Sequence, residues 1–255
     1  MKVILSDGRQ LGLLDTDSLE MKNMTNYYSN SWELYKLHSA SFNEDFKYYL
    51  EFSKGYKTLE LFAGYGRLTN FLFDHGIDIE SVELEPNFAK FITIPENINH
   101  VCNVLNFNPK QKFQRIIAAY NSFCLLTNDS DISLFFHKLD SWLTKDGLVS
   151  LSYYHPDAWE ALNGVSTKLD SFNNVTHFSK CDLSKRKEKI GIWIDEYHYD
   201  SKQDIYSYPV RIYETRDCLK PFLKGTDLVL KNIIQNYDCP DISDPGWIEF
   251  VLEKK

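Results

Sequence analysis

The chain has 255 residues, of which 43% are hydrophobic and 25% are charged, and its formal net charge is −8. This length supports one large α/β domain, or one domain with a small embedded subdomain, and leaves little room for a second full domain. The acidic balance gives no general attraction to a phosphate backbone, so we expect no nucleic-acid partner.

Residues 1–55 are expected to form an N-terminal helical lid segment. After a short strand-like start at residues 3–5, aromatic side chains recur near helical spacing. They are Tyr27, Tyr28, Trp32, Tyr35, Phe42, Phe46 and Tyr49. Such a stripe is typical of core packing, and the alternative for Tyr27 and Tyr28 is that they fold over a ligand.

Residues 56–156 are expected to form a cofactor-binding core, because strand and helix patterns alternate there. The expected strands are 58–62, 78–84, 99–104, 114–120 and 147–154, and the expected helices are 66–75, 86–92 and 130–143. This alternation implies a parallel sheet with right-handed crossovers. Residues 143–147 are similar to a helix end with a glycine just beyond it. Ligands bind at the carboxyl ends of such strands, so the candidate site residues follow each strand.

The most informative motif runs from the first of these strands into a Gly-x-Gly turn. Gly64 and Gly66 would tolerate positive φ and let backbone amides approach a ligand. Glu83 ends the next strand, 19 residues after Gly64 (83 − 64), where a ribose-binding acid is expected. Two residues argue against a dinucleotide. Thr69 stands where the dinucleotide motif has its third glycine, and the acidic side chain of Glu60 lies beside the turn that a pyrophosphate would have to approach. The motif therefore favours a zwitterionic or cationic ligand.

Residues 157–214 are expected to form an antiparallel insertion that covers an acceptor pocket. Segments 175–182, 189–200 and 204–214 alternate with a period of two and are rich in Ile, Trp and Tyr. The basic residues 185–189 between the first two are interpreted as a solvated hairpin turn. His177 and His198 are interpreted as strand residues with satisfied hydrogen bonds.

Residues 215–255 are expected to complete the core sheet. Thr215 would cap a short helix that ends before Gly225, and strands 228–234 and 247–252 would close the sheet edge. Residues 244–246 would form the turn between these strands. A homodimer stays open as an alternative, because long aromatic strands such as 190–199 pair readily if they are edges.

Several common signals are missing from the sequence. The five cysteines form no C-x-x-C pair and the seven histidines form no H-x-x-x-H pair, so we expect reduced thiols and no metal. The sequence has no apolar run of about 18 residues and no signal-peptide pattern, so we expect no membrane association and a cytoplasmic location.

In combination, these motifs resemble the class I S-adenosylmethionine-dependent methyltransferases. Residues 120–128 resemble the corresponding segment of small-molecule N-methyltransferases, including those acting on amino sugars and glycine-like amines. The resemblance implies an α/β, Rossmann-like, mostly parallel seven-stranded sheet with helices on both faces and an antiparallel insertion after the fifth strand. The other matching segments are 59–66 (Leu-Glu-Leu-Phe-Ala-Gly-Tyr-Gly) for the first motif, 82–86 for the second, 102–107 for the adenine-contacting segment and 143–148 for the turn before the fifth strand.

The resemblance implies S-adenosyl-L-methionine as cofactor and S-adenosyl-L-homocysteine as product. Glu83 would chelate the two ribose hydroxyls, and Glu60 would lie near the methionine ammonium. Asn103 would accept a hydrogen bond from the adenine amino group, and Val104 would pack on the base. The whole implied cofactor-binding set is Tyr28, Glu60, Phe62, Ala63, Gly64, Gly66, Glu83, Leu84, Asn103, Val104, Leu105 and Tyr120.

The chain departs from the family pattern at two positions. Phe62 stands where the family has its first glycine, and Asn103 replaces an aspartate, so its oxygen accepts without charge assistance. The resulting Leu-Phe-Ala-Gly string also resembles nucleic-acid methyltransferases. Base methylation is disfavoured, because the expected fourth strand is followed by neither an Asp/Asn-Pro-Pro-Tyr/Phe motif nor a Pro-Cys nucleophile.

Methyl transfer from a sulfonium is an in-line displacement, so positioning of the reactants supplies most of the acceleration. His155 is the candidate general base, because it follows the fifth strand and imidazole titrates near neutral pH. Tyr28 and Tyr153 are the other catalytic candidates, as aromatic faces or hydroxyls near the sulfonium. A neutral amine acceptor would need no base.

The sequence therefore predicts an S-adenosylmethionine-dependent methyltransferase acting on nitrogen, in preference to oxygen, of a small polar metabolite. Two alternatives stay open. One is a protein or peptide methyltransferase, which an exposed groove would favour. The other is a catalytically inactive binding or regulatory protein of the same fold, which the departures at Phe62 and Asn103 keep in consideration.

Overall fold

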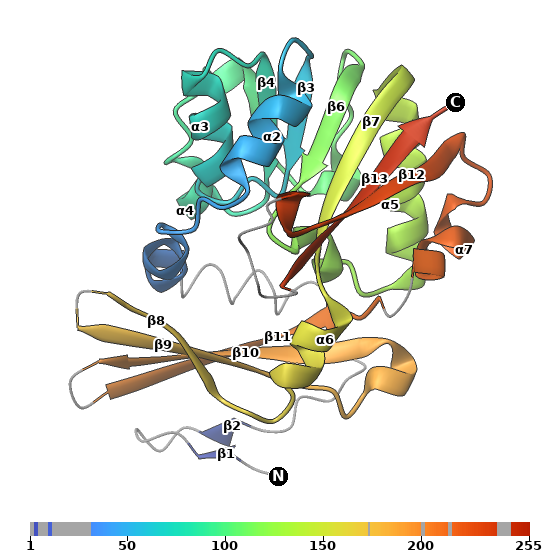
Figure 1. Cartoon of the computed structure of the whole chain (residues 1–255). Coiled ribbons are helices and arrows are strands. Elements are labelled where there is room, and N and C mark those ends of the chain that lie inside the picture. The colour runs from blue at the N-terminus through green and yellow to red at the C-terminus, as the bar shows by residue number, and fades with distance from the viewer. Residues whose placement is uncertain are drawn as a thin grey trace.

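Two β-sheets lie one above the other in the computed structural model (Figure 1), which describes residues 3–4, 10–11, 32–172, 174–199, 202–213, 216–238 and 246–255. The upper sheet has seven strands and the lower sheet has four. A separate pair, β1 (Val3–Ile4) and β2 (Gln10–Leu11), lies beneath the lower sheet. The predicted α/β class is confirmed, together with the antiparallel insertion after the fifth core strand.

The seven-stranded sheet has the order β12-β13-β7-β6-β3-β4-β5. The five neighbouring strands β7, β6, β3, β4 and β5 are parallel to one another. Strand β13 is antiparallel to both of its neighbours, β12 and β7. The order reverses between β3 and β6, and an open α/β sheet forms its ligand crevice at such a point. The strands are β3 (Thr58–Leu61), β4 (Ile79–Glu83), β5 (Asn99–Val101), β6 (Phe113–Ala118), β7 (Leu143–Tyr154), β12 (Leu228–Gln235) and β13 (Trp247–Lys254).

Helices cover both faces of this sheet, and each face has its own apolar core. Ile117 of β6 packs in one core with residues of α2 (Phe46–Ser53) and α3 (Arg67–Asp74). Its neighbour Ile116 points to the opposite face and packs with residues of α5 (Asp129–Trp142). The shorter helices are α4 (Pro86–Ala89), α6 (Pro156–Ala161) and α7 (Lys220–Leu223), with 3₁₀ turns at Glu96–Ile98, Val104–Asn106, Ser122–Leu125, Arg186–Glu188, Arg216–Leu219 and Asn236–Asp238.

The lower sheet is an antiparallel insertion between α6 and the 3₁₀ turn at Arg216–Leu219. Its order is β11-β10-β9-β8, and β8 was not predicted. His177 of β9 lies opposite Tyr197 of β10, and Ser179 lies opposite Asp195. These four residues therefore share one face of the sheet. The strands are β8 (Thr167–Phe172), β9 (Val175–Asp182), β10 (Ile190–Tyr199) and β11 (Lys202–Arg211).

The junction between α5 and β7 differs from the sequence expectation. The helix ends at Trp142 and the strand begins at the next residue, so no glycine follows the helix end. The left-handed residue there is Asp146, with φ 62°. Gly147 is needed for space, because a Cβ would lie 2.9 Å from both the Cδ2 atom of Leu143 and the carbonyl oxygen of Thr144.

Residues 32–39 form a helix that lies between the two sheets (Figure 1). The ring of Trp32 lies 5.7 Å from that of Phe91, and the ammonium groups of Lys36 and Lys90 lie over these rings. Cation–π contacts thus hold this helix against the segment after α4. Tyr27, Tyr28, Thr215, Asp244 and Pro245 lie outside the described residues.

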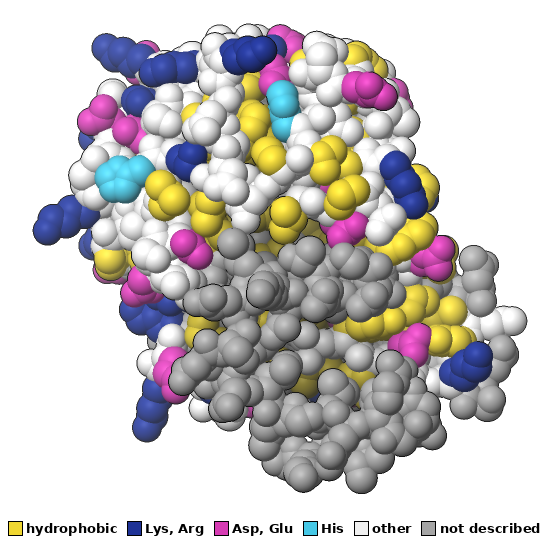
Figure 2. All heavy atoms as spheres, turned by 180° about the vertical axis from the view of Figure 1, so that it is seen from behind, with side chains coloured by type: hydrophobic (Ala, Val, Ile, Leu, Met, Phe, Trp, Pro, Cys, Tyr) yellow, Lys and Arg dark blue, Asp and Glu magenta, His cyan; other side chains and the backbone are white. Residues whose placement is uncertain are grey.

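Within the described ranges, no helix has the length and apolar character that crossing a bilayer requires. The same ranges contain no group of three or more His, Cys, Asp or Glu side chains arranged to hold a metal ion. Figure 2 shows basic and acidic side chains interspersed over one face of the molecule.

Candidate active site

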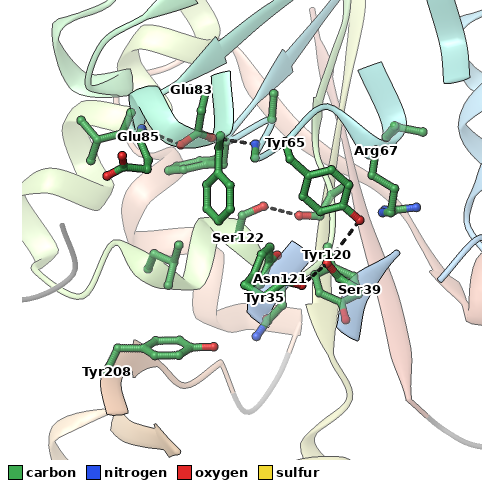
Figure 3. A pocket seen from close by; sticks show the side chains of 18 of the residues that line it. Tyr35, Ser39, Tyr65, Arg67, Glu83, Glu85, Tyr120, Asn121, Ser122 and Tyr208 are labelled. Atoms are coloured by element: carbon green, nitrogen blue, oxygen red, sulfur yellow. Dashed lines mark hydrogen bonds between the residues drawn. The ribbon is translucent and has the colours of Figure 1, made fainter. Parts of the chain in front are cut away.

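A cavity lies between the carboxyl ends of the core strands and the upper face of the insertion sheet. Three parts of the chain line it. The helix at 32–39 contributes Tyr35, His38 and Ser39, and the insertion contributes side chains of β9, β10 and β11. The core contributes the loops after β3, β4, β5 and β6. Figure 3 shows Glu83 and Tyr65 on the core side and Tyr208 on the insertion side of this space.

The turn after β3 forms one wall of the cavity and has an unusual backbone. Phe62 has φ 57°, Gly64 has φ 57° and Gly66 has φ 82°. Phe62 therefore adopts the left-handed conformation that a glycine would adopt easily, at a cost of about 1 to 3 kcal/mol. Gly66 lies behind the wall, where a Cβ would come within 2.8 Å of the Cγ1 atom of Ile92. Backbone strain at a cavity wall is typical of functional sites.

Glu83 connects the ends of β3 and β4. Its Oε2 atom accepts a hydrogen bond from the Gly64 amide at 2.6 Å, and its Oε1 atom accepts one from the Glu85 amide at 2.7 Å. The side chain lines the cavity. Burial raises the pKa of Glu83, and the backbone hydrogen bonds oppose that rise. A carboxylate has about four acceptor sites, so these two bonds leave capacity for ligand hydroxyls.

Glu60 is the second acid of this wall and is only 3% exposed. It accepts a hydrogen bond from the Thr69 hydroxyl, which explains a threonine in place of a third glycine. Burial raises the pKa of Glu60 to about 8. A neighbouring cation would favour the ionised form of this carboxyl.

The segment after β5 forms the next part of the wall. The Oδ1 atom of Asn103 accepts a hydrogen bond from the Leu105 amide at 2.8 Å and so caps the 3₁₀ turn Val104–Asn106. Asn103, Val104 and the half-exposed Leu84 line the cavity. Leu105 is not part of the lining, and its side chain packs into the apolar core.

The loop after β6 lies at the switch point of the sheet. Tyr120 and Asn121 follow each other with φ 55° and 60°, so two consecutive residues adopt the left-handed conformation. Both line the cavity. The Asn121 Oδ1 atom accepts a hydrogen bond from the Tyr154 amide at 3.3 Å, which joins this loop to the end of β7. Burial raises the pKa of Tyr120, as do the charges of Tyr154 and Asp195.

The insertion sheet supplies the opposite wall, where the acid Asp195 is only 2% exposed. The Oδ1 atom of Asp195 accepts hydrogen bonds from His177 Nε2 at 2.9 Å, Ser179 Oγ at 2.6 Å and Trp193 Nε1 at 2.9 Å. Burial acts to raise the pKa of Asp195, but the His177 hydrogen bond and the charges of His38 and His177 hold it below its ordinary value. Tyr208 and Val210 of β11 complete this wall.

Two of the three predicted catalytic residues lie away from the cavity. Tyr153 is fully buried between the rings of Phe123 and Phe250, and its hydroxyl oxygen accepts a hydrogen bond from the Tyr213 amide at 2.7 Å. Its neighbour Tyr154 lines the cavity instead, because adjacent strand residues point to opposite faces. His155 caps α6, where its Nδ1 atom accepts a hydrogen bond from the Asp157 amide at 3.2 Å. The third candidate, Tyr28, lies outside the described residues.

The structure brings most of the predicted cofactor residues to one cavity. Those in its lining are Glu60, Phe62, Ala63, Gly64, Glu83, Leu84, Asn103, Val104 and Tyr120. Sequence reasoning expected the insertion to cover an acceptor pocket but assigned none of the insertion residues to the site. A signal for these residues is present in the sequence: polar and aromatic residues lie two positions apart at His177 and Ser179, and again at Trp193 and Asp195.

No family model matches the sequence, and no curated protein matches it. Solved structures do match the fold. An S-adenosylmethionine-dependent methyltransferase from Clostridium acetobutylicum ATCC 824 aligns with a TM-score of 0.68 and 15% identity, over 91% of this chain and 99% of that chain. The CcbJ methyltransferase from Streptomyces caelestis aligns with a TM-score of 0.75 and 13% identity, over 91% and 98%.

A third match is KedS8, a sugar N-methyltransferase from Streptoalloteichus sp. ATCC 53650. It aligns with a TM-score of 0.64 and 13% identity, over 88% of this chain and 92% of that chain. These alignments span both the seven-stranded core and the insertion, since each covers most of the two chains. The chain therefore has the fold of the S-adenosylmethionine-dependent methyltransferases.

Proposed function

We propose that this chain is an S-adenosylmethionine-dependent methyltransferase that transfers the methyl group to a nitrogen of a small polar metabolite. The observation that carries the proposal is one cavity with two different walls, the strand ends of the core and the aromatic face of the insertion sheet. Such a cavity holds two reactants against each other. That arrangement is the main requirement of an in-line displacement.

The core wall fits an adenosyl amino acid. Glu83 would accept hydrogen bonds from the ribose hydroxyls, since its two backbone bonds already fix its orientation. Val104 would pack on the adenine, and the Asn103 oxygen would accept from the adenine amino group. Glu60 would face the ammonium group of the amino acid. When bound there, S-adenosylmethionine supplies a methyl group on a positively charged sulfur.

The remaining core residues would shape the space around the amino acid portion. Phe62, Ala63 and Gly64 would offer the backbone of the strained turn, and Tyr120 would offer a ring at the switch point. Gly66 would act indirectly, because it gives the turn its path into α3 without lining the cavity. Binding would therefore depend on the shape of this backbone as well as on side chains.

The insertion wall supports an amine as acceptor. Asp195 carries negative charge inside the cavity: burial acts to raise its pKa, but the His177 hydrogen bond, the charges of His38 and His177 and the Ser179 hydrogen bond together hold it below the ordinary value. Trp193 and Tyr208 add aromatic surface beside it. Carboxylates and aromatic faces both favour cations. KedS8, which shares this fold, acts on a sugar nitrogen, as its name states.

The proposal is tested by incubating the protein with S-adenosylmethionine and single acceptors, and by measuring release of S-adenosylhomocysteine. The acceptors are amino sugars, glycine-like amines, the matching alcohols and lysine-containing peptides. We expect turnover with an amine and little with its alcohol. Turnover with peptides alone would support the protein methyltransferase, and cofactor binding without turnover of any acceptor would support the inactive binding protein.

A further inference from the structure

Three aromatic rings are stacked at the insertion side of the cavity. The ring of His177 lies 4.1 Å from that of His38 and 4.8 Å from that of Tyr197, with interplanar angles of 13° in both pairs. The Nδ1 atom of His38 is 2.6 Å from the Tyr197 hydroxyl. His38 and His177 both line the cavity. Two histidines from distant parts of the chain thus meet at the place assigned to the acceptor.

Asp195 fixes the orientation of His177. The Nε2 atom of His177 lies 2.9 Å from Asp195 Oδ1, and Ser179 Oγ lies 3.2 Å from the same nitrogen. A carboxylate at Nε2 places the ring proton there and leaves the lone pair on Nδ1. Among the described residues, no hydrogen bond to Nδ1 of His177 is present. The ring is thus a hydrogen-bond acceptor at the edge that its carboxylate does not occupy.

The stack favours a single positive charge. Two protonated rings 4.1 Å apart would repel each other, whereas one protonated ring is stabilised by the Asp195 carboxylate. Tyr120 of the core belongs to the same electrostatic environment, because the charge of Asp195 contributes to its raised pKa, after burial. Among the described side chains, the titratable groups around His177 are His38 of the helix at 32–39, Asp195 and Tyr197 of β10, Tyr206 and Tyr208 of β11, and Tyr120 of the core. The backbone register partner of His177 on β8 is Asp170.

We propose that His177 is the general base of the site and that Asp195 is its positioning residue. This inference rests on the proposed function. An acceptor that arrives as an ammonium ion loses one proton from nitrogen to Nδ1 of His177. The freed nitrogen lone pair then forms the C–N bond, and the C–S bond breaks with its electron pair staying on sulfur. The products are a methylated ammonium, a neutral thioether and protonated His177, so charge and atoms balance.

The test compares proton release on binding of S-adenosylmethionine and S-adenosylhomocysteine to the full chain. Isothermal titration calorimetry at pH 6.5, in buffers of different ionisation enthalpy, gives the number of protons exchanged. The sulfonium charge opposes protonation of His177, so we expect S-adenosylmethionine to release a larger fraction of a proton than S-adenosylhomocysteine. Both ligands carry the same ammonium group, so the effect of that group on Glu60 cancels in the difference, and the variants below separate any effect of the sulfonium on Glu60 from that on His177.

Three variants assign the difference to its residue. His177→Gln should abolish it, and Asp195→Asn should reduce it, because the amide cannot stabilise the protonated ring. His198→Gln is the matched control, since His198 lies on the same sheet with its side chain 45% exposed, and it should keep the wild-type difference. A wild-type difference in His177→Gln would overturn the inference.

A measurement on the unmodified chain keeps the inference testable if the buried substitutions prevent folding. The ratio of the two dissociation constants should favour S-adenosylmethionine more at pH 8 than at pH 5.5, because the sulfonium charge repels a positive charge in the ring stack. A ratio independent of pH would overturn the inference while leaving the proposed function intact. Failure of both ligands to bind at any pH would instead overturn the proposed function.

Discussion

Asp45 and Arg67 form a buried bidentate ion pair that joins the segment before α2 to the first turn of α3. The two oxygens of Asp45 lie 2.7 and 2.6 Å from the Nη1 and Nη2 atoms of Arg67. Asp45 is fully buried, and the guanidinium also donates to the Phe42 carbonyl at 3.1 Å. Because Arg67 lines the cavity, this pair connects the N-terminal segment to the wall of the candidate site.

Asp45→Asn should be strongly destabilising, because it leaves a buried guanidinium without its counter-charge. Breaking such a pair costs about 3 to 5 kcal/mol of the free energy of unfolding. Urea denaturation measures this loss. Glu51→Gln is the control, because its pair with Lys54 is exposed, and it should change stability little. Equal stability of the two variants would show that the buried pair does not hold the N-terminal segment.

The raised pKa of Glu249 predicts that the free energy of unfolding depends on pH. It is fully buried on β13, where its Oε2 atom accepts hydrogen bonds from Tyr49 at 3.0 Å and Ser150 at 2.6 Å. Burial raises the pKa of Glu249 from 4.5 to about 8. Between these values the folded state binds more protons than the unfolded state. The contribution of Glu249 is therefore complete below about pH 4.5 and is lost as pH rises toward 8.

The variant Glu249→Gln isolates this effect, because its amide does not titrate. Relative to this variant, the wild type should lose stability between pH 5 and pH 8, at up to about 1.4 kcal/mol per pH unit. Denaturant titrations at several pH values measure the difference. Parallel pH curves for the two proteins would contradict the assignment of a raised pKa to Glu249.

Gly66→Ala separates a steric requirement from a conformational one. Gly66 and Gly76 have similar φ values of 82° and 79°, but only at Gly66 would a Cβ meet other atoms within 4 Å. Alanine at Gly76 should cost about 1 to 2 kcal/mol for the left-handed backbone. Alanine at Gly66 should cost about 1 to 3 kcal/mol more from overpacking. Thermal or urea unfolding of both variants checks this order, which equal losses would contradict.

The core of the fold could be predicted from the sequence because its signals are local. The distance of 19 residues from Gly64 to Glu83 contains one helix and one strand, and the structure joins these residues by a hydrogen bond. Helix and strand alternation likewise predicted the order of elements from β3 to β7. The boundaries shifted by a few residues, most clearly at the junction of α5 and β7.

The insertion was expected to cover the acceptor pocket, but the residues that line it there could not be predicted, because their positions depend on the register between strands. His177 and Asp195 are 18 residues apart and meet through the pairing of β9 with β10. Alternation shows which residues share a face, but it does not show which face lies against the core. The same limit explains why Tyr153 was predicted at the site although its neighbour Tyr154 lies there.

The most direct test of the central claim is calorimetric titration of the chain with S-adenosylmethionine and S-adenosylhomocysteine. We predict micromolar binding of both ligands to the wild type, and Glu83→Gln should weaken it by about tenfold or more, which corresponds to about 1.4 kcal/mol. Glu80→Gln should bind normally, because Glu80 is buried on the same strand but pairs with Lys57 and His100 away from the cavity. Failure of the wild type to bind either ligand, or normal binding by Glu83→Gln, would contradict the account.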